Sequence, residues 1–232
     1  METSQENMMY RIIAETDDYI AVDKFPGISF HSESGSAGIA AQLKQDLAVA
    51  NLYPVHRLDK MTSGLLLFGK SLAWAQSINQ QFRDRQVSKF YLALSARKPK
   101  KKQGLVRGDM EKSRRGCWKL LATKENPAVT QFFSHSAEPG LRLFLLRPLT
   151  GKTHQLRVAM KSLGAPIVGD QRYGGEDQDR GYLHAYGLQF QWQGESIRLV
   201  CAPTIGEMFT RSSVQQALLQ YSAPWGIDWP KI

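Results

Sequence analysis

The 232-residue sequence is poor in cysteine: Cys117 and Cys201 are the only two, and they form no Cys-x-x-Cys pair. This spacing argues against a zinc site and against a disulfide framework, so we expect two reduced, structural thiols in a cytoplasmic protein. No apolar run approaches the ~20 residues of a membrane span. The opening METSQENMMYR lacks the basic segment and apolar stretch of a secretory signal.

Several cofactor and nucleophile motifs are also missing. Gly151-Lys152-Thr153 resembles the end of a phosphate-binding P-loop, but that motif needs a glycine where Leu146 stands. The sequence has neither a Gly-x-Gly-x-x-Gly fingerprint nor a Gly-x-Ser-x-Gly elbow. Its five histidines show no His-Glu-x-x-His pattern or i, i+4 pairing. We therefore expect no metal and no cofactor.

Positive charge is abundant and unevenly distributed. The chain has a formal net charge of +9 and a pI of about 9.6. The segment 97–115, which we expect to be a loop, contains nine basic residues against two acidic ones. Such a cluster is typical of a surface that binds a polyanion, although a solvated loop that only aids solubility has the same composition. The basic residues are Arg97, Lys98, Lys100, Lys101, Lys102, Arg107, Lys112, Arg114 and Arg115.

Strand-like and helix-like segments alternate along the chain. Apolar residues at helical spacing predict a helix from Ile39 to Val49, with Ser36 as its N-cap, and another that Ser71 caps. The second should turn Leu72, Ala75, Ile78, Asn79 and Phe82 inward. A helical stretch to Leu163 follows Thr150, and another spans 207–221. Strands are predicted at 19–24, from Leu65, and at 88–94, 117–123, 129–134, 141–146, 182–192 and 196–201. In 88–94, alternation places Lys89, Tyr91 and Ala93 on one face.

These elements predict the fold class. The sequence shows no internal repeat, low-complexity linker or domain break. We expect a single α+β domain over residues 1–232, with a mixed, mostly antiparallel β-sheet flanked by helices and loops.

The densest polar chemistry lies in His56-Arg57-Leu58-Asp59-Lys60-Met61-Thr62-Ser63-Gly64, directly before an apolar strand. Asp59 is the only carboxylate in this stretch, so a two-carboxylate scheme lacks a nearby partner. A single aspartate can act as nucleophile or base if a neighbouring cation keeps it ionised in a dry pocket. Arg157 is the candidate cation, and helical spacing puts it on one face with His154.

Four segments together resemble the RluA-type family of pseudouridine synthases, which isomerise uridine to pseudouridine in rRNA and tRNA. They are DDYIAVDKFPGISFH, HRLDKMTSGLLLFGKS, SKFYLAL and TGKTHQLRVAMKSLGAPIVGDQRYG. The resemblance runs from about residue 12 to Leu183-His184-Ala185, and the motifs stand in the family's order and spacing. It implies that the chain is an RNA-modifying isomerase with the pseudouridine synthase fold.

The resemblance also implies roles for single residues. Asp59 would be the essential catalytic residue, acting on the ribose of the target; whether by attack on C1′ or proton removal from C2′ stays open. Tyr91 would stack on the target base and Arg157 would pair with Asp59. Arg57 would lie beside the flipped-out nucleotide, and His56 and His154 are expected mainly as structural hydrogen-bonding groups. We expect further RNA contacts from Lys89, Lys100, Lys101, Lys102, Arg114, Arg115, Lys152 and His154.

Three departures from the family pattern are Phe25, Lys152 and Ala159, where relatives usually have proline, arginine and histidine. None touches the expected catalytic set. We also expect no N-terminal S4-like RNA-binding domain, because the resemblance begins almost at the first residue. RNA, either rRNA or tRNA, is the expected partner, with the protein acting as a monomer away from membranes.

Two other functions fit parts of the pattern. A catalytically silent RNA-binding or ribosome-associated protein with the same fold would bind RNA without modifying it. A glycosidase-like hydrolase would use similar chemistry at C1′ but release free uracil, and it normally needs two carboxylates. The lack of a second acid near Asp59 disfavours the hydrolase.

Overall fold

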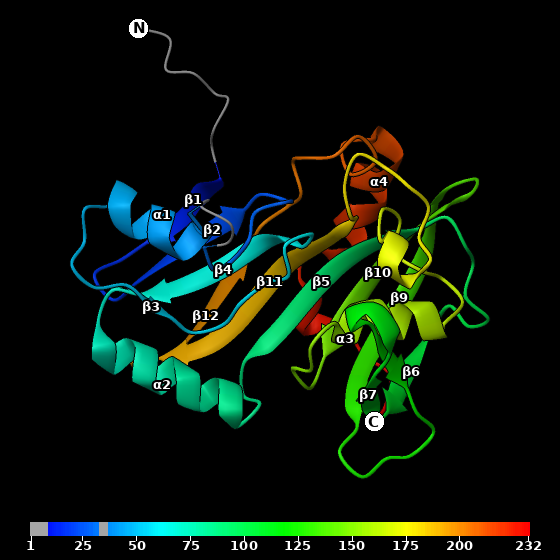
Figure 1. Cartoon of the computed structure of the whole chain (residues 1–232), viewed down its shortest axis with the longest axis horizontal. Helices are drawn as coiled ribbons and strands as arrows, with labels where there is room; N and C mark the ends of the chain where they lie inside the picture. The colour runs from blue at the N-terminus through cyan, green and yellow to red at the C-terminus, as the bar shows by residue number, and fades with distance from the viewer. Residues whose placement is uncertain (1–8, 33–36) are drawn as a thin grey trace, which may run out of the picture.

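Most strand-like segments of the sequence join one sheet (Figure 1). In the computed structural model, which describes residues 9–32 and 37–232, ten strands form a sheet in the order β1-β2-β4-β11-β5-β10-β9-β6, with β3 paired to β4 and β12 paired to β11. The strands are β1 (Tyr10–Glu15), β2 (Tyr19–Lys24), β3 (Tyr53–Pro54), β4 (Ser63–Gly69), β5 (Ser88–Ser95), β6 (Gln103–Gly108), β9 (Ala128–Glu138), β10 (Leu141–Pro148), β11 (Leu183–Trp192) and β12 (Glu195–Val200). A separate hairpin joins β7 (Met110–Lys112) to β8 (Trp118–Leu120).

Among the described residues, every strand pair is antiparallel except one. β4 and β11 run parallel, with Ser63 opposite His184 and Gly64 opposite Ala185. The prediction of a mixed, mostly antiparallel α+β fold is therefore confirmed. β11 pairs with β4 on one side and with β5 on the other. It therefore joins the N-terminal strands β1, β2 and β4 to the strands β5, β10, β9 and β6.

Short helices cover the sheet. They are α1 (Ile39–Asp46), α2 (Leu72–Arg83), α3 (Gln155–Ser162) and α4 (Ser212–Leu218), with 3-10 turns η2 (Arg114–Gly116), η3 (Gln171–Tyr173), η4 (Leu219–Tyr221) and η5 (Pro224–Gly226). Ser71 caps α2 as predicted, because its Oγ accepts from the Trp74 N–H at 3.2 Å. The predicted inward face of α2 is wrong at Leu72, which is 53% exposed, because Trp74 takes the buried place beside Tyr19.

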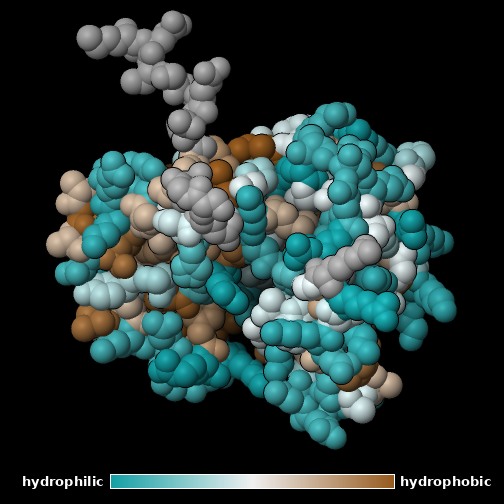
Figure 2. Space-filling view, in the orientation of Figure 1, coloured by the Kyte–Doolittle hydropathy of each residue, from teal (hydrophilic) through white to brown (hydrophobic). Residues whose placement is uncertain are grey.

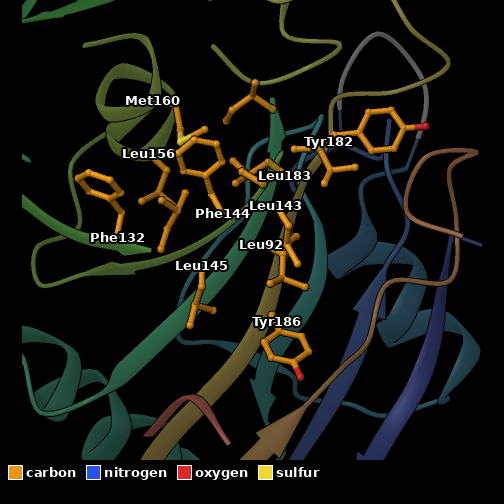
Figure 3. Close-up of a cluster of buried hydrophobic side chains, with 14 of the residues drawn as sticks. Leu92, Phe132, Leu143, Phe144, Leu145, Leu156, Met160, Tyr182, Leu183 and Tyr186 are labelled. Atoms are coloured by element: carbon orange, nitrogen blue, oxygen red, sulfur yellow. The ribbon is translucent and has the colours of Figure 1, made fainter. Parts of the chain in front are cut away.

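Two buried hydrophobic clusters lie in the two halves of the sheet. The larger packs α3 against the central strands, and Figure 3 shows Leu156 and Met160 of α3 beside Phe144 of β10. The C-terminal tail packs elsewhere on these strands, where Trp229 stacks on Phe90 with ring centroids 5.8 Å apart. The smaller cluster lies around β2, β4 and α2.

Two predictions about secondary structure need correction, and a third concerns a residue outside the described part. The basic segment 97–115 is not a loop, because it contains β6, β7 and η2. The C-terminal helix begins at Ser212 rather than Glu207, because residues 207–210 form turns, where Glu207 N–H donates to Asp179 and Met208 N–H to Tyr182. The predicted cap Ser36 lies outside the described residues. Among the described residues, none of the helices is long and apolar enough to cross a membrane.

Gly64 has a φ of +104° at the parallel junction of β4 and β11. A Cβ at this position would lie 2.2 Å from the carbonyl oxygen of Ala185, well inside van der Waals contact. Gly164, after α3, also has a positive φ, +71°, but a Cβ there would meet no atom within 4 Å. The two glycines therefore separate the cost of backbone strain from the cost of close approach.

We expect Gly64→Ala to lower the free energy of unfolding by about 3 kcal/mol or more, since the added methyl would force β4 away from β11. Gly164→Ala should cost only about 1 kcal/mol, because the strain of the left-handed conformation is its only penalty. Urea denaturation of both variants measures the difference. Equal losses would show that close approach at the junction does not constrain the sheet.

Candidate active site

Asp59 lies in the loop between β3 and β4, where the chain makes a tight turn into the sheet. The Thr62 N–H donates to the Asp59 carbonyl at 3.0 Å and closes this turn. Leu58 before it is buried, as is Thr62 after it. The Asp59 side chain remains 34% exposed, so the backbone is anchored while the carboxylate stays accessible.

Lys24 holds the Asp59 loop from the other side. Its Nζ is buried and donates to the carbonyls of Phe25, Ile28 and Lys60 at 2.9, 2.9 and 3.3 Å. Burial, followed by the charge of Arg180, lowers the pKa of Lys24 to about 7, while Asp59 and Asp23 oppose that shift. Three carbonyl acceptors match the three N–H groups of an ammonium, so the geometry favours the charged form. This contact ties the turn after β2 to the loop of Asp59.

Arg157 of α3 connects two carboxylates. Its Nε and Nη2 donate to Asp170 Oδ2 and Oδ1 at 2.7 and 2.8 Å, and its Nη1 lies 3.3 Å from Asp59 Oδ2. Burial by itself lowers the pKa of Arg157, but Asp170 and Asp59 outweigh burial and raise it. The predicted pairing of Asp59 with Arg157 is present. Asp170 fixes the plane of the guanidinium that faces Asp59.

A chain of hydrogen bonds links the β7–β8 hairpin to His154, which lies beside Asp59. The Trp118 N–H donates to Tyr173 Oη at 2.9 Å, and Tyr173 Oη lies 2.8 Å from His154 Nδ1. On the other side of the ring, His154 Nε2 lies 3.9 Å from Asp59 Oδ2, which is beyond hydrogen-bond distance. Burial lowers the pKa of His154 and keeps the ring neutral, although Asp59 opposes the shift.

Asp59, His154 and Arg157 line a cleft of about 600 Å³. Tyr91 of β5 lines it, and burial followed by the negative charge of Asp59 raises the pKa of its phenol. Tyr91 therefore remains a neutral ring and hydroxyl at ordinary pH. The α2–β5 turn lines the cleft on one side and the β10–α3 connection (150–154) on another. In Figure 2 the side of this face that carries α3 is mainly hydrophilic, whereas hydrophobic residues gather toward α1 and α2.

The structure divides the predicted RNA-binding residues into two groups. Arg57, Lys89, Lys152 and His154 line the cleft with Asp59, Tyr91 and Arg157. Lys100, Lys101, Lys102 and Arg114 do not line it, although all four are exposed. The side chain of Arg115 lies outside the described part of the structure.

Strand register shows how far the lysine cluster lies from the cleft. The Lys102 carbonyl accepts from Ser134 N–H, and Ser134 is opposite Phe144 of β10. Pro148, which lines the cleft, is four residues further along β10, or roughly 13 Å at the rise of a strand. Arg114 is elsewhere: its turn η2 leads to Cys117, whose thiol lies 3.6 Å from the Arg172 carbonyl.

His56 has the structural role expected for it, because its Nε2 accepts from the Leu67 N–H at 3.0 Å. Burial, followed by the charge of Lys89, lowers the pKa of His56 to about 3. The ring therefore stays neutral and holds the start of the motif against β4.

Asp23, His184 and Cys201 are buried close enough together to be tested as a metal site. Both ring nitrogens of His184 are already used, since Nδ1 lies 2.7 Å from Ser63 Oγ and Nε2 lies 2.8 Å from the Cys201 carbonyl. Arg180 donates to the same Ser63 Oγ at 2.7 Å, so the proton of that hydroxyl points to His184. This donor set fits a closed hydrogen-bond network under the β4–β11 junction better than a metal. The two cysteines are unpaired, as predicted.

Sequence reasoning missed three residues of the site: Lys24, Asp170 and Tyr173. Asp170 and Tyr173 stand in GDQRYG, at the end of the last segment that carries the family resemblance. A sequence signal for both residues was present, because this short loop places an acidic and an aromatic side chain three positions apart. Lys24 carried no comparable signal, since a lysine at the end of a strand is usually solvated.

Comparison with known proteins gives a consistent result. The family model described as RNA pseudouridylate synthase matches residues 18–162. A Haemophilus influenzae protein named as an RNA pseudouridine synthase is 46% identical over 92% of this chain and 96% of its own length. The ribosomal large subunit pseudouridine synthase C of Rickettsia bellii is 36% identical over 71% of this chain, which spans only 57% of that relative. The structure of human RNA pseudouridylate synthase domain containing 1 superposes with a TM-score of 0.75 at 25% identity, covering 96% of this chain and 98% of its own.

We expect Asp170→Asn to lower the free energy of unfolding by about 3 kcal/mol, because it removes the buried one of the two carboxylates that pair with the buried Arg157 guanidinium. Glu207→Gln is the matched control: it makes the same acid-to-amide change in an exposed ion pair with Arg211. That variant should cost less than about 1 kcal/mol. Chemical denaturation followed by tryptophan fluorescence compares them, and losses of equal size would contradict a structural role for the Arg157–Asp170 pair.

Proposed function

Because this chain belongs to the RNA pseudouridylate synthase family, we propose that it converts uridine to pseudouridine in RNA with Asp59 as its catalytic residue. The observation that carries the assignment of Asp59 is its position. It is the only carboxylate that lines the described cleft, and it faces a guanidinium that a second carboxylate holds in place. We propose that residues 1–232 act as one catalytic domain, as a monomer and in the cytoplasm.

The reaction breaks the N1–C1′ bond of uridine, turns the base, and forms a C5–C1′ bond, while the proton leaves C5 and N1 gains one. Nothing is transferred to a second molecule, so the chain's own side chains suffice. Asp59 acts on the ribose while ionised, whether it attacks C1′ or removes a proton from C2′. Arg157 supplies the positive charge beside it, with Nη1 3.3 Å from Asp59 Oδ2.

Tyr91 would stack on the target base, and the basic residues of the cleft would contact the RNA strand. The target must leave its stack, at a cost of a few kcal/mol. The Tyr91 ring, half-buried in the cleft, offers a surface for stacking that returns about 1–3 kcal/mol. Arg57 is exposed at the cleft and makes no side-chain hydrogen bond or ion pair with the described residues. It is therefore available to the flipped nucleotide, as Lys89, Lys152 and His154 are from the cleft wall.

Ribosomal RNA is the substrate that we propose first. The curated relatives from Rickettsia bellii and Haemophilus influenzae that are named for a target are ribosomal large subunit synthases. The chain covers 57% and 63% of their lengths, so their target selection need not pass to it whole. Transfer RNA is the second class to test.

We expect Asp59→Asn to abolish isomerisation, by on the order of 10⁴-fold or more, because the amide can neither attack C1′ nor accept a proton. Tritium release from [5-³H]uridine-labelled rRNA and tRNA measures the reaction. Asp17→Asn, an exposed turn carboxylate, is the control and should behave as wild type. Binding of RNA without tritium release by the wild-type chain would favour the silent RNA-binding protein. Free uracil among the products would favour the hydrolase.

Replacing Lys100, Lys101 and Lys102 with Ala should weaken binding to long rRNA but leave the rate at saturating RNA unchanged. These lysines are exposed and lie outside the cleft, so we propose that they contact flanking phosphates. Each lost contact should reduce the slope of log affinity against log salt by about 0.7–0.9. Salt-dependent filter binding measures this slope, with Lys44→Ala as a control from α1. An unchanged slope would rule out these contacts.

A further inference from the structure

An arginine occupies the position after α2 where glycine is usual. α2 ends at Arg83 with Asp84 as its C-cap, and Arg85 follows with a φ of +58°. Two backbone hydrogen bonds close the turn, from Gln86 N–H to the Gln81 carbonyl at 2.8 Å and from Arg85 N–H to the Phe82 carbonyl at 3.2 Å. This pattern is the Schellman motif, in which the left-handed residue is most often glycine because a Cβ is strained there.

No contact within the described chain accounts for the arginine. The Arg85 side chain is exposed and makes no hydrogen bond, ion pair or ring contact with the described residues. The corresponding position after α3 is Gly164, with a φ of +71°. Arg83, in the last turn of α2, already places a positive charge at the helix C-terminus, where the helix dipole favours one. Backbone strain that no contact within the chain compensates is typical of functional positions.

The turn faces the cleft. Arg83 and Arg85 both line it, together with Arg57 and Lys89. Asp84, between the two arginines, does not line the cleft, and its carboxylate accepts from Gln80 Nε2 at 2.9 Å from each oxygen. Asp59 is the one carboxylate among the described lining residues, and Arg157 pairs with it. The wall formed by the turn is therefore positive and has no acidic partner of its own.

We propose that this turn, with Arg85 at its centre and Arg83 and Arg57 beside it, binds a backbone phosphate of the RNA strand that enters the cleft. The inference rests on the proposed function for the nature of the polyanion. An exposed guanidinium that lines the cleft is well suited to phosphate, since its planar fork can donate two parallel hydrogen bonds. The contact reads no base, so it positions the strand rather than selecting a sequence.

The test uses Arg85→Gly, because fold and function then predict opposite effects. Glycine relieves the left-handed strain, so the melting temperature should stay the same or rise. Affinity for a fluorescein-labelled, uridine-containing RNA hairpin should fall, and the slope of log affinity against log salt should decrease by about 0.7–0.9. The wild-type advantage should accordingly shrink about threefold between 50 and 200 mM salt. Arg85→Lys keeps the charge and should keep the wild-type slope.

Two control variants separate strain from charge. Ala48→Gly relieves a φ of +51° after α1 without changing charge, and Lys44→Ala removes an exposed charge from α1. Neither residue lines the cleft, so both should leave RNA affinity and its salt slope unchanged. An unchanged slope in Arg85→Gly would overturn the proposal. A lower melting temperature for that variant would also overturn it, because the arginine would then hold the fold.

The salt dependence of RNA binding tests the phosphate site whether or not the chain modifies the RNA hairpin. Tritium release at saturating RNA should be the same for Arg85→Gly and wild type, with only the RNA concentration for half-maximal rate raised. If the wild-type chain released no tritium, the proposed function would fail, while the salt slopes would still decide the phosphate site. A loss of rate at saturating RNA would instead place Arg85 in the chemistry and contradict a positioning contact.

Discussion

One guanidinium, that of Arg157, is shared between a buried carboxylate and an accessible one. Asp170 takes two of its donors at 2.7 and 2.8 Å, which fixes the plane and leaves Nη1 directed at Asp59 at 3.3 Å. Neither acid alone would give this arrangement. Without Asp170 the desolvated arginine would be free to close fully on Asp59, and without Arg157 the Asp59 carboxylate would have no guanidinium beside it. The unequal sharing gives Asp59 a counter-charge and leaves its carboxylate accessible.

The rest of the fold brings these three groups together from distant parts of the chain. Asp59 is placed by the parallel junction of β4 and β11, where Gly64 allows the strands to approach, and by Lys24, which holds the Lys60 carbonyl. Arg157 is placed by α3, which packs Leu156 on the central strands. Because each support belongs to a different element, the geometry of the pair depends on the whole sheet. This explains why so much buried polar structure surrounds one carboxylate.

Much of this arrangement was predictable from local patterns. Strand and helix positions followed from apolar periodicity and from the Ser71 cap, and the Asp59–Arg157 pair followed from the family motifs. Asp170, Tyr173 and Lys24 were not predicted, because their roles come from single side-chain contacts, to Arg157, His154 and the Lys60 carbonyl, that apolar periodicity does not encode. Leu72 was wrongly predicted to face inward. Helical spacing predicts a stripe of apolar residues along α2, but the large, fully buried Trp74 side chain decides which edge of that stripe faces the core.

Charge shows the limit of sequence reasoning most clearly. The run of nine basic residues at 97–115 dominates the sequence, yet Lys100, Lys101 and Lys102 directly precede the edge strand β6 and do not line the cleft. The basic residues of the cleft come singly or in pairs from separate segments, as Arg57, Lys89 and Lys152 do, and no window of the sequence looks unusually basic around them. A field is strongest where charges converge on a concave, poorly solvated surface, because low-dielectric walls focus it. Folding, rather than local composition, therefore concentrates positive potential at Asp59, and a dense basic run is better suited to long-range attraction of RNA than to holding the nucleotide at the carboxylate.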